Sequence, residues 1–321
     1  MLHDLLFVAA GLVLLFVGGE GLVRGSVAIA ERLGISKLLI GLVIVGFGTS
    51  TPELLVSVNA ALDGASEIAL GNVVGSNIAN ILLIVGVAAL IAPIMGWERT
   101  AVREALVATL VSLAAFVLVQ GEIITRIEGI AMLMVLAGYL FSTYWLERRN
   151  RAAKTFQHEA EAFEDIPLRR PWLAPVLALG GIAALVFGAD LLVDGAVNIA
   201  RTFGVPDAVI GLSLVAIGTS LPELATAIVA AIRRQSDVVL GNVIGSNIFN
   251  ILAILGVTVV IQPIEVSARF RTIDTPVMLG AALLLLTLLF ATTKVGRLWG
   301  ILMLVAYAAY MVFLFSSGMS A

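Results

Sequence analysis

The sequence predicts an all-α polytopic membrane protein with ten transmembrane helices, arranged as two five-helix repeats of inverted topology. Three observations predict this fold class. Hydrophobic residues make up 60% of the 321 residues and charged residues only 13%, and the mean hydropathy is +1.08. Apolar stretches long enough to cross a bilayer recur along the whole chain. Two polar motifs also occur twice, 170 residues apart. A soluble globular domain is excluded by this composition.

A bilayer core about 30 Å thick requires roughly 20 apolar residues for each helix. The first stretch is too long for a signal peptide and lacks a small-residue cleavage site, so we expect it to be retained. The predicted spans are 4–30, 38–62, 67–92, 101–120, 127–146, 172–200, 207–232, 237–262, 273–292 and 297–317.

The internal repeat divides the chain into a first five-helix unit at 1–146, a linker at 147–171 and a second five-helix unit at 172–321. Five spans are an odd number, so the second unit must enter the membrane from the opposite side. Inverted repeats of this kind are typical of secondary transporters, whose substrate site lies near the midplane where the repeats meet.

Charge in the connecting segments predicts the orientation. One set of segments, which includes the linker, holds most of the Lys and Arg residues, and by the positive-inside rule it faces the cytoplasm. The opposite set holds only Arg126, Arg201, Arg269 and Arg271. We therefore expect a multi-pass protein of the cell (inner) membrane with both termini outside.

The first repeated motif is Gly48–Leu54, which recurs as Gly218–Leu224. Its threonine and glutamate are four residues apart, so on a helix they share one face, and the serine between them adds a hydroxyl. The proline removes a backbone donor and is expected to kink the helix and free carbonyl groups. The residues concerned are Thr49, Ser50, Pro52, Glu53, Thr219, Ser220, Pro222 and Glu223.

The second motif, Gly71–Asn80, recurs as Gly241–Asn250. Polar residues at every fourth position give each helix a polar stripe, while GxxxG pairs indicate close helix packing. The stripes consist of Asn72, Ser76 and Asn80 in the first copy and Asn242, Ser246 and Asn250 in the second, and Asn77 and Asn247 widen them.

Carboxylate, hydroxyl, amide and carbonyl oxygens are ligands for hard cations such as Na⁺ or Ca²⁺. Buried membrane carboxylates are costly, so Glu53 and Glu223 are expected to serve an ion, with the neighbouring Thr, Ser and Asn residues of both halves. Two glutamates neutralise one Ca²⁺ or two Na⁺, which favours antiport. Cysteine is absent and both histidines lie outside the spans, so thiolate sites are excluded and zinc is disfavoured.

The patterns G-T-S-x-P-E and G-N-x-x-G-S-N-x-x-N, each present twice, resemble the alpha repeats of the sodium/calcium exchanger family, most closely its short prokaryotic members. The resemblance implies that Glu53, Glu223, Thr49 and Thr219 coordinate Ca²⁺. It also implies flanking Na⁺ sites. Their ligands would be Ser50, Ser76, Ser220 and Ser246, completed by the carbonyls of Gly46 and Ala216, with Asn80 and Asn250 level with the glutamates. Some family members have an aspartate where this chain has Asn250, so one potential negative charge is missing.

The expected function is Ca²⁺ extrusion driven by Na⁺ entry through alternating access, in which spans one and six rock or slide across the centre. A Ca²⁺/H⁺ antiporter, or one for another cation, is the alternative. A cation channel and an intramembrane hydrolase with a carboxylate dyad are further alternatives. We expect no enzyme activity, no organic cofactor, no nucleic acid and no obligate protein partner besides the lipid bilayer.

Overall fold

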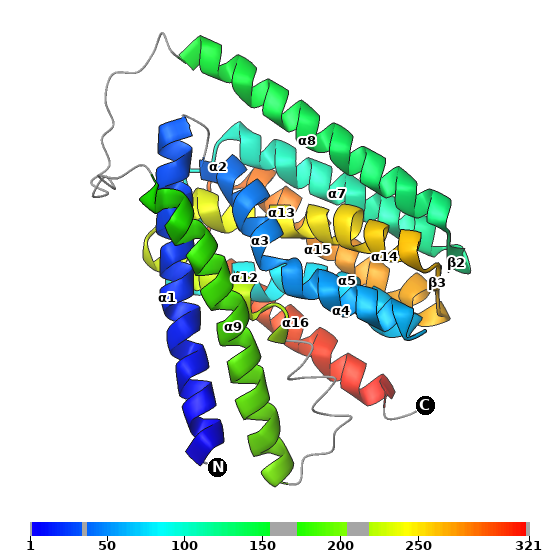
Figure 1. Cartoon of the computed structure of the whole chain (residues 1–321). Helices are drawn as coiled ribbons and strands as arrows, with labels where there is room; N and C mark the ends of the chain where they lie inside the picture. The colour runs from blue at the N-terminus through cyan, green and yellow to red at the C-terminus, as the bar shows by residue number, and fades with distance from the viewer. Residues whose placement is uncertain (1, 34–36, 155–171, 204–217, 319–321) are drawn as a thin grey trace.

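The computed structural model describes residues 2–33, 37–154, 172–203 and 218–318. These parts of the chain are almost entirely helical, with four two-residue strands and four π-helical segments (Figure 1). The first half contains α1 (Leu2–Leu33), α2 (Lys37–Ile40), η1 (Gly41–Val45), α3 (Gly46–Thr49), α4 (Thr51–Leu62), α5 (Ser66–Ala79), η2 (Asn80–Val85), α6 (Gly86–Ile91), β1 (Ile94–Met95), α7 (Arg99–Val119), β2 (Ile123–Ile124) and α8 (Arg126–Lys154). The second half contains α9 (Leu173–Thr202), α12 (Leu221–Ile232), α13 (Ser236–Phe249), η4 (Asn250–Leu255), α14 (Gly256–Ile261), β3 (Ile264–Glu265), η5 (Phe270–Asp274), α15 (Thr275–Ala291), β4 (Lys294–Val295) and α16 (Arg297–Gly318).

Within the described residues, eight helices are long and apolar enough to cross a membrane. The bent pair Gly41–Thr49 and Thr51–Leu62 makes a ninth if it counts as one span. The predicted span at 207–232 begins outside the described residues, and its described part is the short apolar helix α12. The chain is therefore a mostly helical multi-pass membrane protein, while the number ten stays a prediction. Helix α8 continues to Lys154, so the expected linker begins as helix.

The elements of the two halves recur in the same order. Helices α4 and α5 and the segments η2 and α6 have counterparts with bounds shifted by 170 residues in α12, α13, η4 and α14. The strands also join the halves reciprocally, since β1 pairs with β4 and β2 pairs with β3, both antiparallel. The strand contacts between the halves thus occur in matched pairs.

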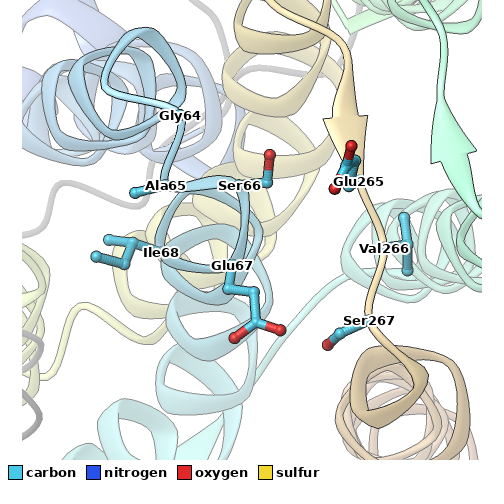
Figure 2. Close-up of a pocket in the computed structure, with 8 residues that line it drawn as sticks. All are labelled: Gly64, Ala65, Ser66, Glu67, Ile68, Glu265, Val266 and Ser267. Atoms are coloured by element: carbon cyan, nitrogen blue, oxygen red, sulfur yellow. The ribbon is translucent and has the colours of Figure 1, made fainter.

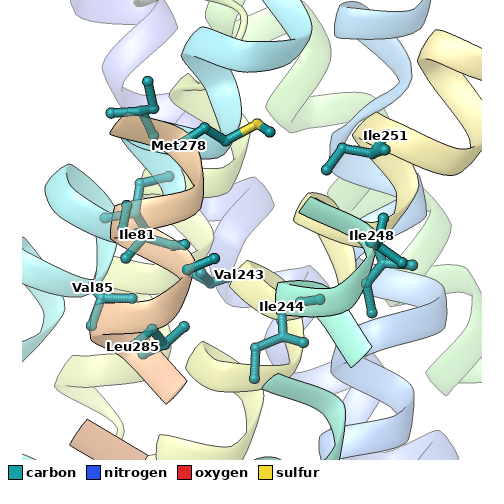
Figure 3. Packing of buried hydrophobic residues seen from close by; sticks show 14 of the residues in the cluster. Ile81, Val85, Val243, Ile244, Ile248, Ile251, Met278 and Leu285 are labelled. Carbon is teal, nitrogen blue, oxygen red and sulfur yellow. The ribbon is translucent and has the colours of Figure 1, made fainter. Parts of the chain in front are cut away.

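The centre of the molecule is formed by the helices that carry the second motif. Of the apolar window in each helix, 72% is buried for Ser66–Ile91 and 78% for Ser236–Ile261, against 17% for Arg126–Thr143 and 11% for Arg297–Leu314. Figure 3 shows the apolar packing around the central helices, to which Met278 and Leu285 of α15 contribute. The second motif is therefore held in the best-packed part of the fold.

Helices α1 and α9 lie side by side along one flank of the bundle (Figure 1). Glycines allow their backbones to approach closely. A Cβ atom built on Gly25 would lie 2.5 Å from Ala178 N, and one built on Gly181 would lie 2.5 Å from Leu22 N. No side chain fits at such positions without moving backbone.

This packing generates a stability prediction for two adjacent glycines of α9. Gly181→Ala is expected to destabilise the protein by about 1–3 kcal/mol, because the added methyl group would press on the α1 backbone. Gly180→Ala is the matched control, since among the described residues no packing neighbour lies within 4 Å of a Cβ atom built on Gly180. Melting temperatures of the purified variants in detergent test this. Equal melting temperatures would contradict the described α1–α9 contact.

Candidate functional site

The first motif lies at a break in the second predicted span. Helix α3 ends at Thr49, α4 begins at Thr51, and the two segments are bent by 47°. Pro52 lies in the first turn of α4, where its missing N–H costs no helical hydrogen bond. The predicted kink is thus present. However, Thr49 and Glu53 lie on opposite sides of the break, so the expectation that they share one continuous helix face was wrong.

The second copy has the same local structure where it is described. Helix α12 begins at Leu221, with Pro222 and then Glu223 in its first turn. Glu53 and Glu223 are each only 1% exposed, and Thr219 and Ser220 before the helix are also buried. The predicted carbonyl ligand Ala216 lies outside the described residues.

Each glutamate is contacted by the serine of the opposite half. Ser50 Oγ donates to Glu223 Oε1 at 3.0 Å, and Ser220 Oγ donates to Glu53 Oε1 at 3.4 Å. Ser220 Oγ also lies 3.5 Å from Ser76 Oγ. One oxygen of each carboxylate is therefore fixed by a hydroxyl group, and the two halves share one polar cluster.

Two asparagines, Asn72 and Asn242, each form a hydrogen bond to a glutamate backbone of their own half and to a threonine of the other half. Asn72 Nδ2 donates to Glu53 O at 2.9 Å, and Asn72 Oδ1 accepts from Thr219 Oγ1 at 3.5 Å. In the other half, Asn242 Nδ2 donates to Glu223 O at 3.4 Å, and Asn242 Oδ1 accepts from Thr49 Oγ1 at 3.4 Å. The sequence placed both on the polar stripe but carried no sign of this role, which depends on the opposite half.

The carbonyl group of Gly46 also faces this cluster. Ser246 Oγ and Thr49 Oγ1 each donate to Gly46 O at 3.4 Å, and Thr49 Oγ1 donates to Val45 O at 2.9 Å. A Cβ atom on Gly46 would lie 3.0 Å from Ser246 N, so glycine is needed for the close approach of α3 to α13. The Gly46 carbonyl group also accepts from Ser50 N at 3.2 Å, so it keeps a helical hydrogen bond while it faces the hydroxyl groups of the cluster.

Several buried polar atoms of the cluster have no hydrogen-bond partner within the described chain. Among the described residues, six buried side-chain atoms lack a hydrogen-bond partner: Ser26 Oγ, Glu53 Oε2, Asn77 Oδ1, Asn80 Oδ1, Glu223 Oε2 and Asn250 Oδ1. Four of these belong to predicted site residues, and all four are oxygen acceptors. Leaving such groups unpaired costs about 1–3 kcal/mol each, and more for charged groups. Oxygen acceptors of this kind are the ligands that hard cations take.

Two further buried acids, which the sequence analysis missed, have partners of another kind. Glu104, 2% exposed, accepts from Arg103 Nε at 2.9 Å and from Tyr139 OH at 2.7 Å. Asp274, also 2% exposed, lies 3.0 Å from Arg269 Nε and accepts from Tyr310 OH at 3.0 Å. These acids are neutralised by arginine and join neighbouring helices. In the part of the chain that the structure describes, no ion pair is formed by Glu53 or Glu223.

A separate surface cavity of about 340 Å³ lies between the turn before α5 and the strand β3 (Figure 2). Glu67 and Glu265 line it together with Ser66 and Ser267. None of the predicted site residues takes part. The candidate site is thus the buried cluster between the halves, and no group of three or more His, Asp or Glu residues that could hold a metal ion is found in the described chain.

Comparison with known proteins shows what the whole chain is similar to. The profile of the sodium/calcium exchanger protein family matches residues 3–145 and again residues 173–316. CaxA of Alkalimonas amylolytica is 41% identical over 322 residues, which cover 99% of this chain and 100% of CaxA. The sodium/calcium exchanger MaX1 of Methanosarcina acetivorans is 33% identical, with 97% of this chain and 98% of MaX1 covered. A structure of the sodium-calcium exchanger NCX_Mj superposes with a TM-score of 0.84 at 32% identity, covering 98% of this chain and 99% of NCX_Mj.

The unpaired carboxylates generate a stability prediction. In a chelating buffer at mildly alkaline pH, the double variant Glu53→Gln, Glu223→Gln is expected to melt about 5 °C higher than the wild type, because two buried charges without counter-ions are removed. Glu104→Gln is the control and should melt lower, since it leaves Arg103 without its carboxylate. Thermal denaturation in detergent measures both shifts. A lower melting temperature for the double variant would show that the glutamates are stably compensated by the protein itself.

Proposed function

The chain belongs to the sodium/calcium exchanger family, and from this premise we propose that it exchanges Na⁺ for Ca²⁺ across the membrane by alternating access. The observation that carries the proposal is the group of four buried acceptors without partners that belong to predicted site residues, two from each half. Glu53 and Asn80 come from the first half and Glu223 and Asn250 from the second. In this proposal the protein is no enzyme and needs no organic cofactor.

The charge of the site accounts for the coupling. Two ionised glutamates neutralise one Ca²⁺ or two Na⁺, so the two loads compete for the same buried oxygens. Ca²⁺ takes six to eight oxygen ligands, more than one half offers. We assign it to the centre, between Glu53, Glu223, Thr49 and Thr219. Release of Ca²⁺ would leave two unpaired buried charges unless Na⁺ replaces it, and this penalty enforces exchange.

The flanking Na⁺ sites follow from the hydroxyl and carbonyl groups around the centre. Ser50 N and Ser246 Oγ both donate to the Gly46 carbonyl group. On the other side of the cluster, Ser220 Oγ donates to Ser76 Oγ. Oxygen ligands without further charge suit a monovalent hard cation. We assign the following residues to the Na⁺ sites: Ser50, Ser76, Ser220, Ser246, Gly46 and Ala216. In this proposal the side chains of Asn80 and Asn250 lie level with the two glutamates along the membrane normal.

For the whole chain we propose ten spans in two inverted repeats, at 1–146 and 172–321, joined by a cytoplasmic linker at 147–171. The matched pairs of contacts between the halves support a two-fold relation of this kind. Both termini would face outward, with Ca²⁺ extruded as Na⁺ enters. Helices α1 and α9, which lie together on one flank, are the proposed moving elements.

Transport in proteoliposomes tests the exchange. We expect vesicles loaded with Na⁺ and diluted into Na⁺-free buffer to take up radiolabelled Ca²⁺, and Glu53→Gln or Glu223→Gln to abolish this uptake, because either change removes half of the charge that balances Ca²⁺. A pH gradient without Na⁺ is the control. Uptake driven by that gradient alone would assign the protein to Ca²⁺/H⁺ exchange, and an uncoupled Ca²⁺ flux would indicate a channel.

Single cysteines test the orientation, because the chain has none of its own. Asp63 and Glu98 are exposed in connections that the proposed topology places on opposite sides of the membrane. In intact cells, a membrane-impermeant maleimide should label Asp63→Cys and spare Glu98→Cys. Disrupted cells provide the control in which both react. Labelling of Glu98→Cys alone in intact cells would reverse the proposed orientation.

A further inference from the structure

Four buried asparagines lie where the central helices pass into their π-helical segments. Asn77 and Asn247 lie near the ends of α5 and α13, and Asn80 and Asn250 begin η2 and η4. They are 0–2% exposed. Asn80 and Asn250 are proposed to lie beside the cations, whereas the proposed function gives no task to Asn77 and Asn247.

Asn247 determines how Asn80 is oriented. Asn80 Nδ2 donates to Asn247 Oδ1 at 3.0 Å, and Asn247 Nδ2 donates to the backbone oxygen of Asn77 at 3.4 Å. Because the donor and acceptor arms of an amide point in different directions, engaging Nδ2 of Asn80 also fixes its Oδ1. That Oδ1 atom is buried and has no protein partner. A residue of one half thus aims an acceptor of the other.

The equivalent hydrogen bond, between Asn250 and Asn77, is not formed. If the two halves had the same contacts, Asn250 Nδ2 would donate to Asn77 Oδ1, and Asn77 Nδ2 would donate to the backbone oxygen of Asn247. Instead, Asn77 Nδ2 donates to Val73 O of its own helix at 2.7 Å, and Asn77 Oδ1 has no partner. The difference between the halves therefore lies in the direction of the Asn77 side chain.

We propose that Asn247 and Asn77 are positioning residues that orient Asn80 and Asn250, respectively, in the two alternate access states. This inference rests on the proposed function, in which inverted repeats exchange conformations when access changes. When access changes, the Asn80–Asn247 hydrogen bond breaks and the Asn250–Asn77 hydrogen bond forms. Rotation of Asn77 away from Val73 O is the local event, and the asparagine quartet is the two-state element that the cations bias.

A role as interhelical glue explains the quartet less well. Asparagines that only join helices would satisfy both arms of each amide in a low-dielectric interior. Asn77 keeps a buried acceptor free although Asn250 begins the opposite π-helical segment at the equivalent position. In the proposed scheme the partner of Asn77 Oδ1 arrives in the other access state.

Ca²⁺ transport from each face of the membrane tests the inference. Right-side-out and everted vesicles expose opposite faces. Asn247→Ala is expected to raise KM for Ca²⁺ about 10-fold at one face, and Asn77→Ala at the opposite face, with kcat largely kept, because each removes the partner of one cation ligand in one state. The two variants are matched controls for each other, since they remove the same group at equivalent positions.

Asn59→Ala, at an exposed position of α4, controls for the substitution itself and should leave both KM values unchanged. An equal rise at both faces for both variants, or no rise at either face, would overturn the inference while the proposed function stands. Wild-type vesicles without Na⁺-dependent uptake would overturn both. If a variant transports too slowly for kinetics, the Ca²⁺ dependence of its melting temperature reports the affinity, and an unchanged dependence rejects the positioning role.

Discussion

Burial of two carboxylates that form no ion pair with a basic side chain of the described chain is the constraint on which the rest of the structure depends. Glu53 and Glu223 are fully enclosed, and in the described chain neither forms an ion pair. An isolated charge in such an interior costs several kcal/mol even after relaxation. The surrounding groups do not remove that cost. Ser50 and Ser220 each satisfy one oxygen and leave the second without a partner.

The site exists only where the halves are in contact. Each carboxylate takes its hydroxyl partner from the other half, and Asn72 and Asn242 connect a glutamate backbone of one half to a threonine of the other. Close glycine contacts between α3 and α13 make such short distances possible. In the proposed exchange, any movement of one half against the other changes the oxygens around the cation, so ion binding is coupled to conformation without a separate relay.

Much of this arrangement could be predicted from the sequence, because a repeated acid-bearing motif in an apolar chain admits few explanations. The kink at Pro52, the burial of Glu53 and the recurrence of equivalent elements in the two halves follow from the motifs and their 170-residue spacing. Contacts between the halves do not. Nothing in the spacing indicates that Ser50 contacts Glu223 rather than Glu53, or that the π-helical segments begin at Asn80 and Asn250. These depend on tertiary packing.

The buried acids Glu104 and Asp274 clarify what separates a structural carboxylate from a transporting one. Burial alone does not, because they are as enclosed as Glu53. The sequence separates the two kinds in part, since Arg103 is adjacent to Glu104 and Arg269 lies five residues before Asp274, whereas each tyrosine partner lies 35 or 36 residues away on another helix. The two kinds differ in the source of the positive charge beside the carboxylate. A carboxylate held by an arginine has its positive charge fixed in the chain and cannot exchange it. One that meets only hydroxyl and amide groups must take its cation from solution, and can give it back.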